Sequence, residues 1–264
     1  AFVIGKESYS NWIETNPKCK EVLKPYLIGR DIQRYGNTES DKYLILFPCG
    51  YTNKNTDKED KWEWIKDNFI QIANHLEPFK DAAEKRWDKG DYWWELRPCD
   101  YYDKFGLKKI IYLKFQVKPA FTFDTTGAVG NSATWIITNN DILILAILNS
   151  KLGWYLISKF CTEIRGGYQL IYKYLKNIPI ALPAESIKLN LDSKVTFIME
   201  NNKALSTNLL KMGRSIKRQF DIDKLSKNLQ SWHTLTYIEF TKELKKKKIK
   251  LGLAEEAEWE EYFE

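Results

Sequence analysis

Several residues on which common catalytic sites depend are scarce in this sequence. Its 264 residues include only two histidines, His75 and His233, so a histidine-based metal site or an HNH-type nuclease centre is hard to build. The four cysteines, at positions 19, 49, 99 and 161, show no C-x-x-C spacing, which excludes a zinc ribbon or knuckle. Free thiols in a reducing compartment fit this distribution best.

Motifs of several enzyme classes are also missing. The sequence has no G-x-x-x-x-G-K-S/T phosphate loop, no G-x-S-x-G nucleophile elbow and no N-P-P-Y segment for adenine methylation. Asn177 opens "NIPI", which lacks the second proline and the aromatic ring that would stack on a flipped base. Asp41, Glu59 and Lys61 only loosely resemble the D…E-x-K array that holds magnesium in nucleases. With no complete active site, the chain favours recognition over catalysis.

Long hydrophobic runs are rare as well. The run at residues 136–150 is interrupted by Asn139, Asn140 and Asp141, so we expect no membrane span, and no signal peptide is visible. We therefore expect a soluble, cytoplasmic protein. The chain begins without methionine in a strand-like pattern, as expected of a segment of a longer protein.

Aromatic and basic residues, by contrast, are plentiful. There are ten Trp, fifteen Tyr and thirteen Phe residues, and the net charge is +6. Residues 88–105, "DKGDYWWELRPCDYYDKF", hold six aromatic rings, and we expect most of these rings to pack in the domain core and stabilise it. From Lys108 to Lys176, nine lysines and arginines stand against three acidic residues. Such a segment suits an anionic partner if its charges share one face, and is otherwise a solvated surface.

Hydrophobic periodicity predicts an α+β fold: a mixed α/β domain at residues 1–183 and a helical C-terminal region at residues 184–264. Gly, Pro and strand patterns become rare after Pro183, and Thr236 with Glu239 predicts a capping box. The positive charge of a lysine run near residue 246 and the negative charge of an acidic run near residue 258 largely offset each other. Such runs are typical of solvated helix faces; the alternative is that they dock on DNA or on a partner. Strands are predicted at 1–8, 42–50, 108–124 and 133–138, and helices at 10–24, 62–86 (broken or bent by Pro78), 140–160, 192–218 and 236–262.

Three segments carry a family resemblance. "KPYLIGRDIQRY", "WWELRPCDYYDKFGLKKIIY" and "LNSKLGWYLISKF…EIRGGYQLIYKYLKNIPI" resemble successive landmarks of the TaqI-type C-terminal specificity domain, in the order of that family. Such domains recognise the target of adenine-specific DNA methyltransferases and of fused type IIG restriction-modification enzymes. The C-terminal sequence from Tyr237 is also similar to the helical C-terminal region of type IIG enzymes.

The resemblance implies a function for the chain and for its parent. The chain would read double-stranded DNA opposite a methyltransferase module that lies outside it, binds S-adenosylmethionine and flips the target adenine. The chain itself would need no cofactor and no metal. A protein-interaction module that docks a methyltransferase partner through aromatic surface and C-terminal helices is the alternative.

Candidate DNA-binding residues are those able to meet phosphates or base edges. A guanidinium pairs with phosphate or with guanine O6 and N7. Arg30 and Arg34 follow a glycine, although Asp31 could hold one of them, and Arg97 could instead be a buried anchor stacked on Trp93 or Tyr101. The charged candidates outside the motifs are Lys54, in a polar loop, and Lys89, beside the aromatic cluster.

Two glycine-containing loops complete the candidate site. In "IRGGY", Gly166 and Gly167 would let backbone amides approach phosphate beside Arg165 and Tyr168, with Lys173 close by, or would only form a strand-to-helix corner. In "TGAVGNSATW", Asn131, Ser132 and Thr134 could touch bases in the major groove, or the segment could be an ordinary hairpin.

Overall fold

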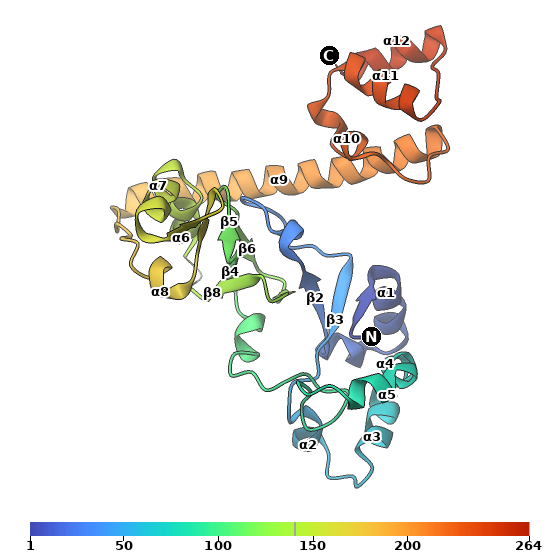
Figure 1. Ribbon diagram of the computed structural model, residues 1–264, viewed down its shortest axis with the longest axis vertical. Helices are drawn as coiled ribbons and strands as arrows, with labels where there is room; N and C mark the ends of the chain where they lie inside the picture. The colour runs from blue at the N-terminus through green and yellow to red at the C-terminus, as the bar shows by residue number, and fades with distance from the viewer. Residues whose placement is uncertain (140, 264) are drawn as a thin grey trace. The chain divides into compact units, whose positions relative to one another are not determined.

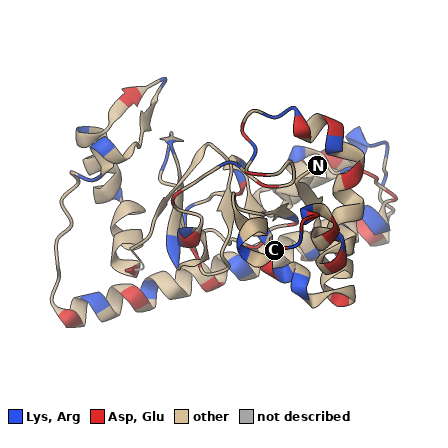
Figure 2. Ribbon diagram, turned by 90° about the horizontal axis from the view of Figure 1, so that it is seen from below, with Lys and Arg blue, Asp and Glu red and all other residues tan. Residues whose placement is uncertain are grey.

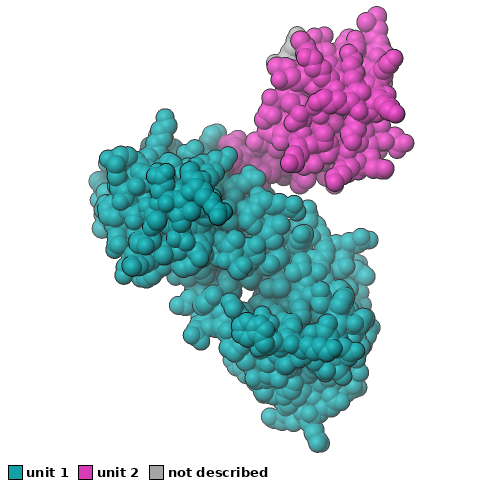
Figure 3. All heavy atoms as spheres, in the orientation of Figure 1, with its two compact units in different colours: residues 1–199 teal, residues 200–264 magenta. Residues whose placement is uncertain are grey.

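The computed structural model of the protein describes residues 1–139 and 141–263 (Figure 1). These residues form two compact units, residues 1–199 and residues 200–264 (Figure 3). The first unit combines helices with three small sheets and the second is helical, so the predicted α+β class is confirmed.

The N-terminal sheet contains four strands in the order β1-β3-β2-β7. They are β1 (Val3–Gly5), β3 (Lys42–Ile45), β2 (Leu23–Leu27) and β7 (Val129–Gly130). All neighbours are antiparallel except β2 and β7, which pair in parallel. The helix predicted at 10–24 is wrong in part, because α1 (Lys6–Thr15) and a 3₁₀ turn at Pro17–Glu21 end before Leu23 enters β2. The strand predicted at 1–8 is likewise cut short, since α1 begins at Lys6.

Short helices pack beneath this sheet. They are α2 (Tyr51–Asn55), α3 (Lys61–Asn68), α4 (Ile70–Leu76), a 3₁₀ turn at Glu77–Phe79 and α5 (Lys80–Glu84). The single helix predicted at 62–86 is interrupted at Pro78, as expected, and also at Phe69, whose backbone leaves the helical region. Their core joins Phe47, Ile65, Phe69 and Ile72 to Trp94.

The second sheet has the order β6-β4-β8 and carries the next core. Strands β4 (Lys109–Leu113), β6 (Phe121–Asp124) and β8 (Thr134–Ile137) pair antiparallel. Ile110 and Tyr112 face one hydrophobic cluster and Ile111 faces another, so β4 is buried on both sides, as the period of two residues requires.

Helices α6 (Ile142–Leu148) and α7 (Lys151–Phe160) adjoin this sheet (Figure 1). They meet at 74°, so the single helix predicted at 140–160 is wrong; Asn140 lies outside the described residues. The break falls at Ser150, whose backbone is extended and whose hydroxyl accepts from the amide of Gly153 at the start of α7. Beside it, the buried Asn149 side chain donates to the carbonyl of Phe121 and accepts from its amide. Across the described residues no single helix has the length and apolar character to cross a bilayer, although α6 and α7 together pass by length and composition.

A third sheet, in the order β5-β10-β9, contains β5 (Phe115–Gln116), β10 (Gly167–Gln169) and β9 (Thr162–Ile164). Short helix α8 (Tyr172–Leu175) follows it, and α9 (Glu185–Gln219) then runs from the first unit into the second. The remaining elements are 3₁₀ turns at Gly29–Asp31, Asp103–Gly106 and Trp232–Thr234, and helices α10 (Lys227–Gln230), α11 (Tyr237–Lys246) and α12 (Leu253–Glu261).

The second unit has its own core, in which Ile216, Leu229, Phe240 and Leu244 are buried. The capping box predicted before α11 is confirmed: the Thr236 hydroxyl accepts from the amide of Glu239, whose carboxylate accepts from the amide of Thr236. The helix predicted at 236–262 is split into α11 and α12.

Candidate nucleic-acid interface

A cavity of about 710 Å³ opens on the surface of the first unit, where segments far apart in the sequence meet. One wall comes from residues 96–105 and the other from β7, β8 and the loop between them, with Leu44 and Leu46 beside them. The cavity brings together four of the predicted DNA-binding residues, Arg97, Asn131, Ser132 and Thr134.

Arg97 is an exposed charged group on the first wall. Its side chain is exposed, and within the described residues no ion pair or hydrogen bond engages its guanidinium, so the reading of Arg97 as a buried anchor is wrong. Its backbone is held, because the Tyr102 hydroxyl donates to the Arg97 carbonyl at 2.8 Å. Burial raises the pKa of Tyr102 to about 12, so this donor keeps its proton at physiological pH.

Flat rings lie beside this guanidinium. Tyr101, Phe105 and Trp135 line the cavity, and the Tyr101 side chain is 47% exposed. Tyr101 meets Phe105 edge to face, with ring centroids 5.7 Å apart. Lys104 adds a second exposed cation to the same wall. The wall can therefore offer charge, hydrogen-bond donors and ring faces to one ligand.

The loop on the second wall is a tight turn in which some polar side-chain groups form hydrogen bonds and others do not. The Asn131 amide donates to the carbonyl of Leu27, which fixes the loop to β2. The Thr134 hydroxyl donates to the carbonyl of Asn131, and the Asn131 side-chain oxygen accepts from the amide of Ala133. Within the described residues, the Asn131 side-chain amide and the exposed Ser132 hydroxyl form no hydrogen bond, so they remain for a ligand, whereas Thr134 serves the turn.

A buried ion pair holds both walls. The Lys109 ammonium donates to the Asp124 carboxylate, and both side chains are 0% exposed. The same ammonium donates to the carbonyl of Phe105 at 2.6 Å, while Asp124 accepts from the amides of Thr126 and Ala128. Burial lowers the pKa of Lys109, and the Asp124 carboxylate opposes that shift. The pair thus anchors the turn before β4 and the loop that leads into β7.

The segment "IRGGY" forms a hairpin rather than the strand-to-helix corner considered from sequence. Arg165 and Gly166 are the two turn residues between β9 and β10, with φ angles of 51° and 74°. A two-residue hairpin turn of this type requires positive φ angles at both turn residues. The Arg165 side chain is exposed at the tip of the hairpin. Gly167 is buried, and a Cβ there would lie 2.5 Å from the carbonyl oxygen of Gln116, so its role is strand packing.

Tyr168 and Lys173 lie on the elements next to this tip. Tyr168 meets Trp154 of α7 edge to face at 5.3 Å, which attaches the hairpin to that helix. Lys173 is exposed on α8, with its ammonium 5.8 Å from the ring centre of Tyr174.

Exposed cations are frequent in the part of the sequence that contains the hairpin. All basic residues from Lys108 to Lys176 are exposed except Lys109. Of the three acidic residues in this range, Asp124 is buried and Asp141 lies 3.1 Å from Lys188, so only Glu163 lacks a basic partner there within the described residues. Figure 2 shows the basic residues of the molecule in blue. The exposed basic residues of the range are Lys108, Lys114, Lys118, Lys151, Lys159, Arg165, Lys173 and Lys176.

Lys114 connects the cavity to the hairpin through its backbone. Its amide donates to the carbonyl of Ala133, in the loop of the cavity, and its carbonyl accepts from the amide of Leu170, just after β10. Residue-by-residue reasoning from sequence missed Lys114, as it missed Lys151, Lys159 and Lys176, although the excess of basic residues over this range was visible. The backbone of Lys114 therefore joins the loop of the cavity to the end of β10.

The other predicted residues do not line the cavity. The Arg30 side chain is 76% exposed and lies 3.9 Å from Asp31, whose carboxylate mainly accepts from the amide of Ile28. The Arg34 guanidinium lies 5.5 Å from the ring centre of Tyr35. Lys54 is exposed on α2. The Lys89 ammonium donates to the carbonyls of Glu84 and Arg86, so it closes the end of α5.

The aromatic cluster of residues 88–105 is largely structural, as interpreted from the sequence. Trp93 and Trp94 are buried, and the guanidinium of Arg86 donates to the carbonyls of Trp93 and Glu95. The Glu95 carboxylate is fully buried and accepts from the amides of Gly50, Thr52 and Asp91.

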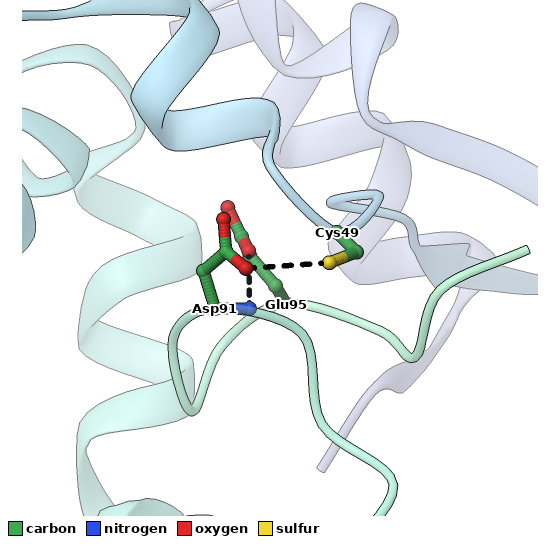
Figure 4. A group of neighbouring side chains, drawn as sticks. All are labelled: Cys49, Asp91 and Glu95. Atoms are coloured by element: carbon green, nitrogen blue, oxygen red, sulfur yellow. Dashed lines mark hydrogen bonds between the residues drawn. The ribbon is translucent and has the colours of Figure 1, made fainter.

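Cys49, Asp91 and Glu95 are the one group of three ligand-type side chains close enough for a metal ion within the described residues (Figure 4). The Glu95 oxygens already accept from backbone amides, and the Cys49 thiol lies 3.5 Å from an Asp91 oxygen. Burial and the nearby Asp91 raise the pKa of Cys49, which disfavours the thiolate that a metal needs. This arrangement does not fit a metal site. Asp41 and Glu59 belong to no such group among the described residues.

Comparisons with known proteins identify a family for most of the first unit. A family model described as the TaqI-like C-terminal specificity domain matches residues 24–180, and a model of a domain of unknown function, DUF8810, matches residues 184–264. Among solved structures, the type IIL restriction-modification enzyme MmeI in complex with DNA is similar, with 12% identity and a TM-score of 0.42. The match covers 81% of this chain and 26% of the MmeI chain. A search of curated proteins gave no match.

Proposed function

Because the chain belongs to the family of TaqI-like C-terminal specificity domains, we propose that it reads a specific sequence in double-stranded DNA. Its parent would be an adenine-specific DNA methyltransferase or a fused type IIG restriction-modification enzyme. The methyltransferase module, with its S-adenosylmethionine, would lie outside this chain and meet the same DNA from the opposite side. We further propose that recognition belongs to residues 1–183 and that residues 184–264 form a separate helical region.

The observation that carries the proposal is the convergence of Arg97, Asn131 and Ser132 on one open cavity. These side chains offer the donors that read base edges, since a guanidinium pairs with guanine O6 and N7 and an amide pairs with adenine. Each has a polar group without an internal partner among the described residues, so binding DNA would not require breaking bonds within the protein.

The basic surface beside the cavity suits phosphates. Lys114, Arg165 and Lys173 are exposed, and the sequence from Lys108 to Lys176 has only three acidic residues, of which Asp124 is buried. Phosphate contacts set the register and orientation of a protein on a duplex, while base contacts in the groove specify the sequence. We assign the first role to this surface and the second to the cavity. Arg30, which follows β2 close to the loop of Asn131, would extend the phosphate contacts.

Fluorescence anisotropy with labelled duplexes, starting at about 50 mM salt, tests these roles. Arg97→Ala is expected to weaken binding by about 1 to 3 kcal/mol and to relax preference at one base pair. Arg97→Lys keeps the charge but loses the planar fork, so it should restore affinity without restoring that preference. Lys114→Ala or Lys173→Ala should weaken binding to all sequences and lower the salt slope by about one.

Lys20→Ala is the matched control, because Lys20 is exposed on the 3₁₀ turn at Pro17–Glu21 and belongs neither to the cavity lining nor to the basic range Lys108–Lys176. It should leave affinity and salt slope unchanged. A dissociation constant that does not respond to salt would contradict the proposal. A stable complex that forms equally well with and without duplex, seen by light scattering, would instead favour the protein-docking alternative.

A further inference from the structure

The C-terminal half of α9 carries an unusual distribution of charge. Between Glu200 and Asp221 the chain has no acidic residue, and Lys211, Arg214, Lys217 and Arg218 are all exposed. Within the described residues none of these four side chains forms an ion pair or a hydrogen bond. The first part of the helix differs, since acidic and basic bands alternate along it (Figure 2).

The four cations share one face of the helix. At about 100° per residue, Lys211, Arg214, Lys217 and Arg218 fall within an arc of about 120°. Met212, Ile216 and Phe220 fall on the opposite side, where they pack into the core of the second unit. The core therefore orients the helix so that the cationic face, Lys211 to Arg218, points to solvent.

The helix dipole accounts for only part of this pattern. Cations in the last turn of a helix stabilise its carbonyl end, which explains Lys217 and Arg218. Lys211 and Arg214 lie further from that end, where the effect has faded. Four like charges within two turns also repel one another, so an anionic partner would relieve a cost that the free helix bears.

We propose that this cationic face is a second DNA-binding surface, which contacts the phosphate backbone of a duplex without regard to sequence. It lies in the region that matches a domain of unknown function, outside the recognition surface of the first unit. The inference goes beyond sequence reading, because it concerns other residues and a different kind of contact.

A duplex fits the face better than other anions do. Lys211 and Arg218 are about 10 Å apart along the helix axis, and a duplex presents about one phosphate charge per 1.7 Å of its own axis. A single phosphate would leave most of the four cations unused. A membrane surface would need an apolar face free to insert, whereas Ile216 is buried and Met212 packs against the core.

The test is a quadruple variant of the 264-residue chain, Lys211→Gln, Arg214→Gln, Lys217→Gln and Arg218→Gln. Binding to a random-sequence duplex is measured by anisotropy at several salt concentrations. If each side chain meets one phosphate, the slope of log Kd against log salt should fall by up to about 3.6, and affinity at 0.1 M salt by at least about tenfold. Lys211→Gln with Arg214→Gln alone spares the helix end and should give about half the change in slope.

The control removes four charges elsewhere in the same unit: Lys245→Gln, Lys247→Gln, Lys248→Gln and Lys250→Gln, all exposed. It should change the slope much less. If both quadruple variants lost the same salt slope and affinity, the effect would come from net charge alone, and the proposal would be wrong. The proposal would also be wrong if neither variant lost salt slope or affinity. A changed oligomeric state with unchanged DNA binding would overturn it too, by pointing to the acidic α12 of a second copy as the partner.

The two proposals can fail separately. The α9 variant should keep any sequence preference of the chain, whereas Arg97→Ala should lose part of it. Suppose that the unsubstituted protein binds all duplex sequences equally and that the α9 variant shows a reduced salt slope. This result would support the α9 proposal and contradict the proposal of sequence reading.

Discussion

Asp124→Asn tests whether the buried ion pair fixes the walls of the cavity. Lys109 and Asp124 are 0% exposed, so the neutral asparagine would leave the Lys109 ammonium buried without a counter-charge. Breaking a buried pair by removing one partner costs about 3 to 5 kcal/mol. We expect the free energy of unfolding, from urea denaturation followed by circular dichroism at pH 7, to fall by about that amount.

Asp67→Asn is the matched control. Asp67 and Lys58 lie 2.5 Å apart, but their side chains are 48% and 53% exposed, so water screens the pair. Exposed pairs contribute little to stability. The same chemical change at Asp67 should therefore lower stability far less than at Asp124.

The double variant Lys109→Met with Asp124→Asn separates charge from anchoring. It removes the lone buried charge, so it should be more stable than Asp124→Asn alone. Because methionine at position 109 cannot donate to the carbonyl of Phe105, the turn before β4 loses an anchor. The DNA affinity of the double variant should therefore stay below that of the unsubstituted protein. A loss below about 1 kcal/mol in Asp124→Asn, or a loss equal to that in Asp67→Asn, would show that the buried ion pair does not stabilise the cavity walls.

Three further substitutions follow from local geometry. Arg165→Asn should hold or raise stability, because asparagine tolerates the φ of 51°. Because Arg165 is assigned to phosphate contact, affinity for all duplexes should fall and the salt slope should drop by about one; urea denaturation and anisotropy measure the two effects. Gly167→Ala should cost about 1 to 3 kcal/mol of unfolding free energy, since its Cβ would lie 2.5 Å from the Gln116 carbonyl, whereas Gly106→Ala, with nothing within 4 Å, should be tolerated. Hydrogen bonds from Lys246, Ser226 and Asn228 hold the pKa of Glu243 at about 2, below its ordinary 4.5. The ionised form stabilises the fold, so this stability is complete above pH 5 and lost towards pH 2, and thermal melts of Glu243→Gln should depend less on pH in that window.

Local signals in the sequence predicted local features well. The capping box at Thr236 was recognisable because both of its partners lie within four residues. The interruption at Pro78 was predictable because proline lacks an amide donor. The structural role of Trp93 and Trp94 followed from the number of rings in a short segment.

Features that depend on distant partners were not predictable in this way. The helical spacing of residues 10–24 gave no sign that Leu23 would pair with β3, some twenty residues later in the chain. Beside the bend between α6 and α7, the Asn149 side chain forms hydrogen bonds to Phe121, which is also distant in the sequence. The sequence thus indicated apolar faces but not which of them would meet.

The candidate site shows the same division. Arg97 and Asn131 were identified as candidates one by one, but only the fold brings them to one cavity. Lys89 looked equivalent in the sequence, yet its ammonium is occupied by carbonyls at the end of α5. Lys114 was overlooked because its position depends on backbone pairing with Ala133 and Leu170.

Selection from a pool of randomised duplexes is the most direct test of sequence reading. The 264-residue chain would be incubated with the pool at low salt, and the bound DNA sequenced over successive rounds. We expect enrichment of one short motif, with the preference at one position relaxed in Arg97→Ala. Retention of all sequences alike, or of no duplex at all, would contradict it.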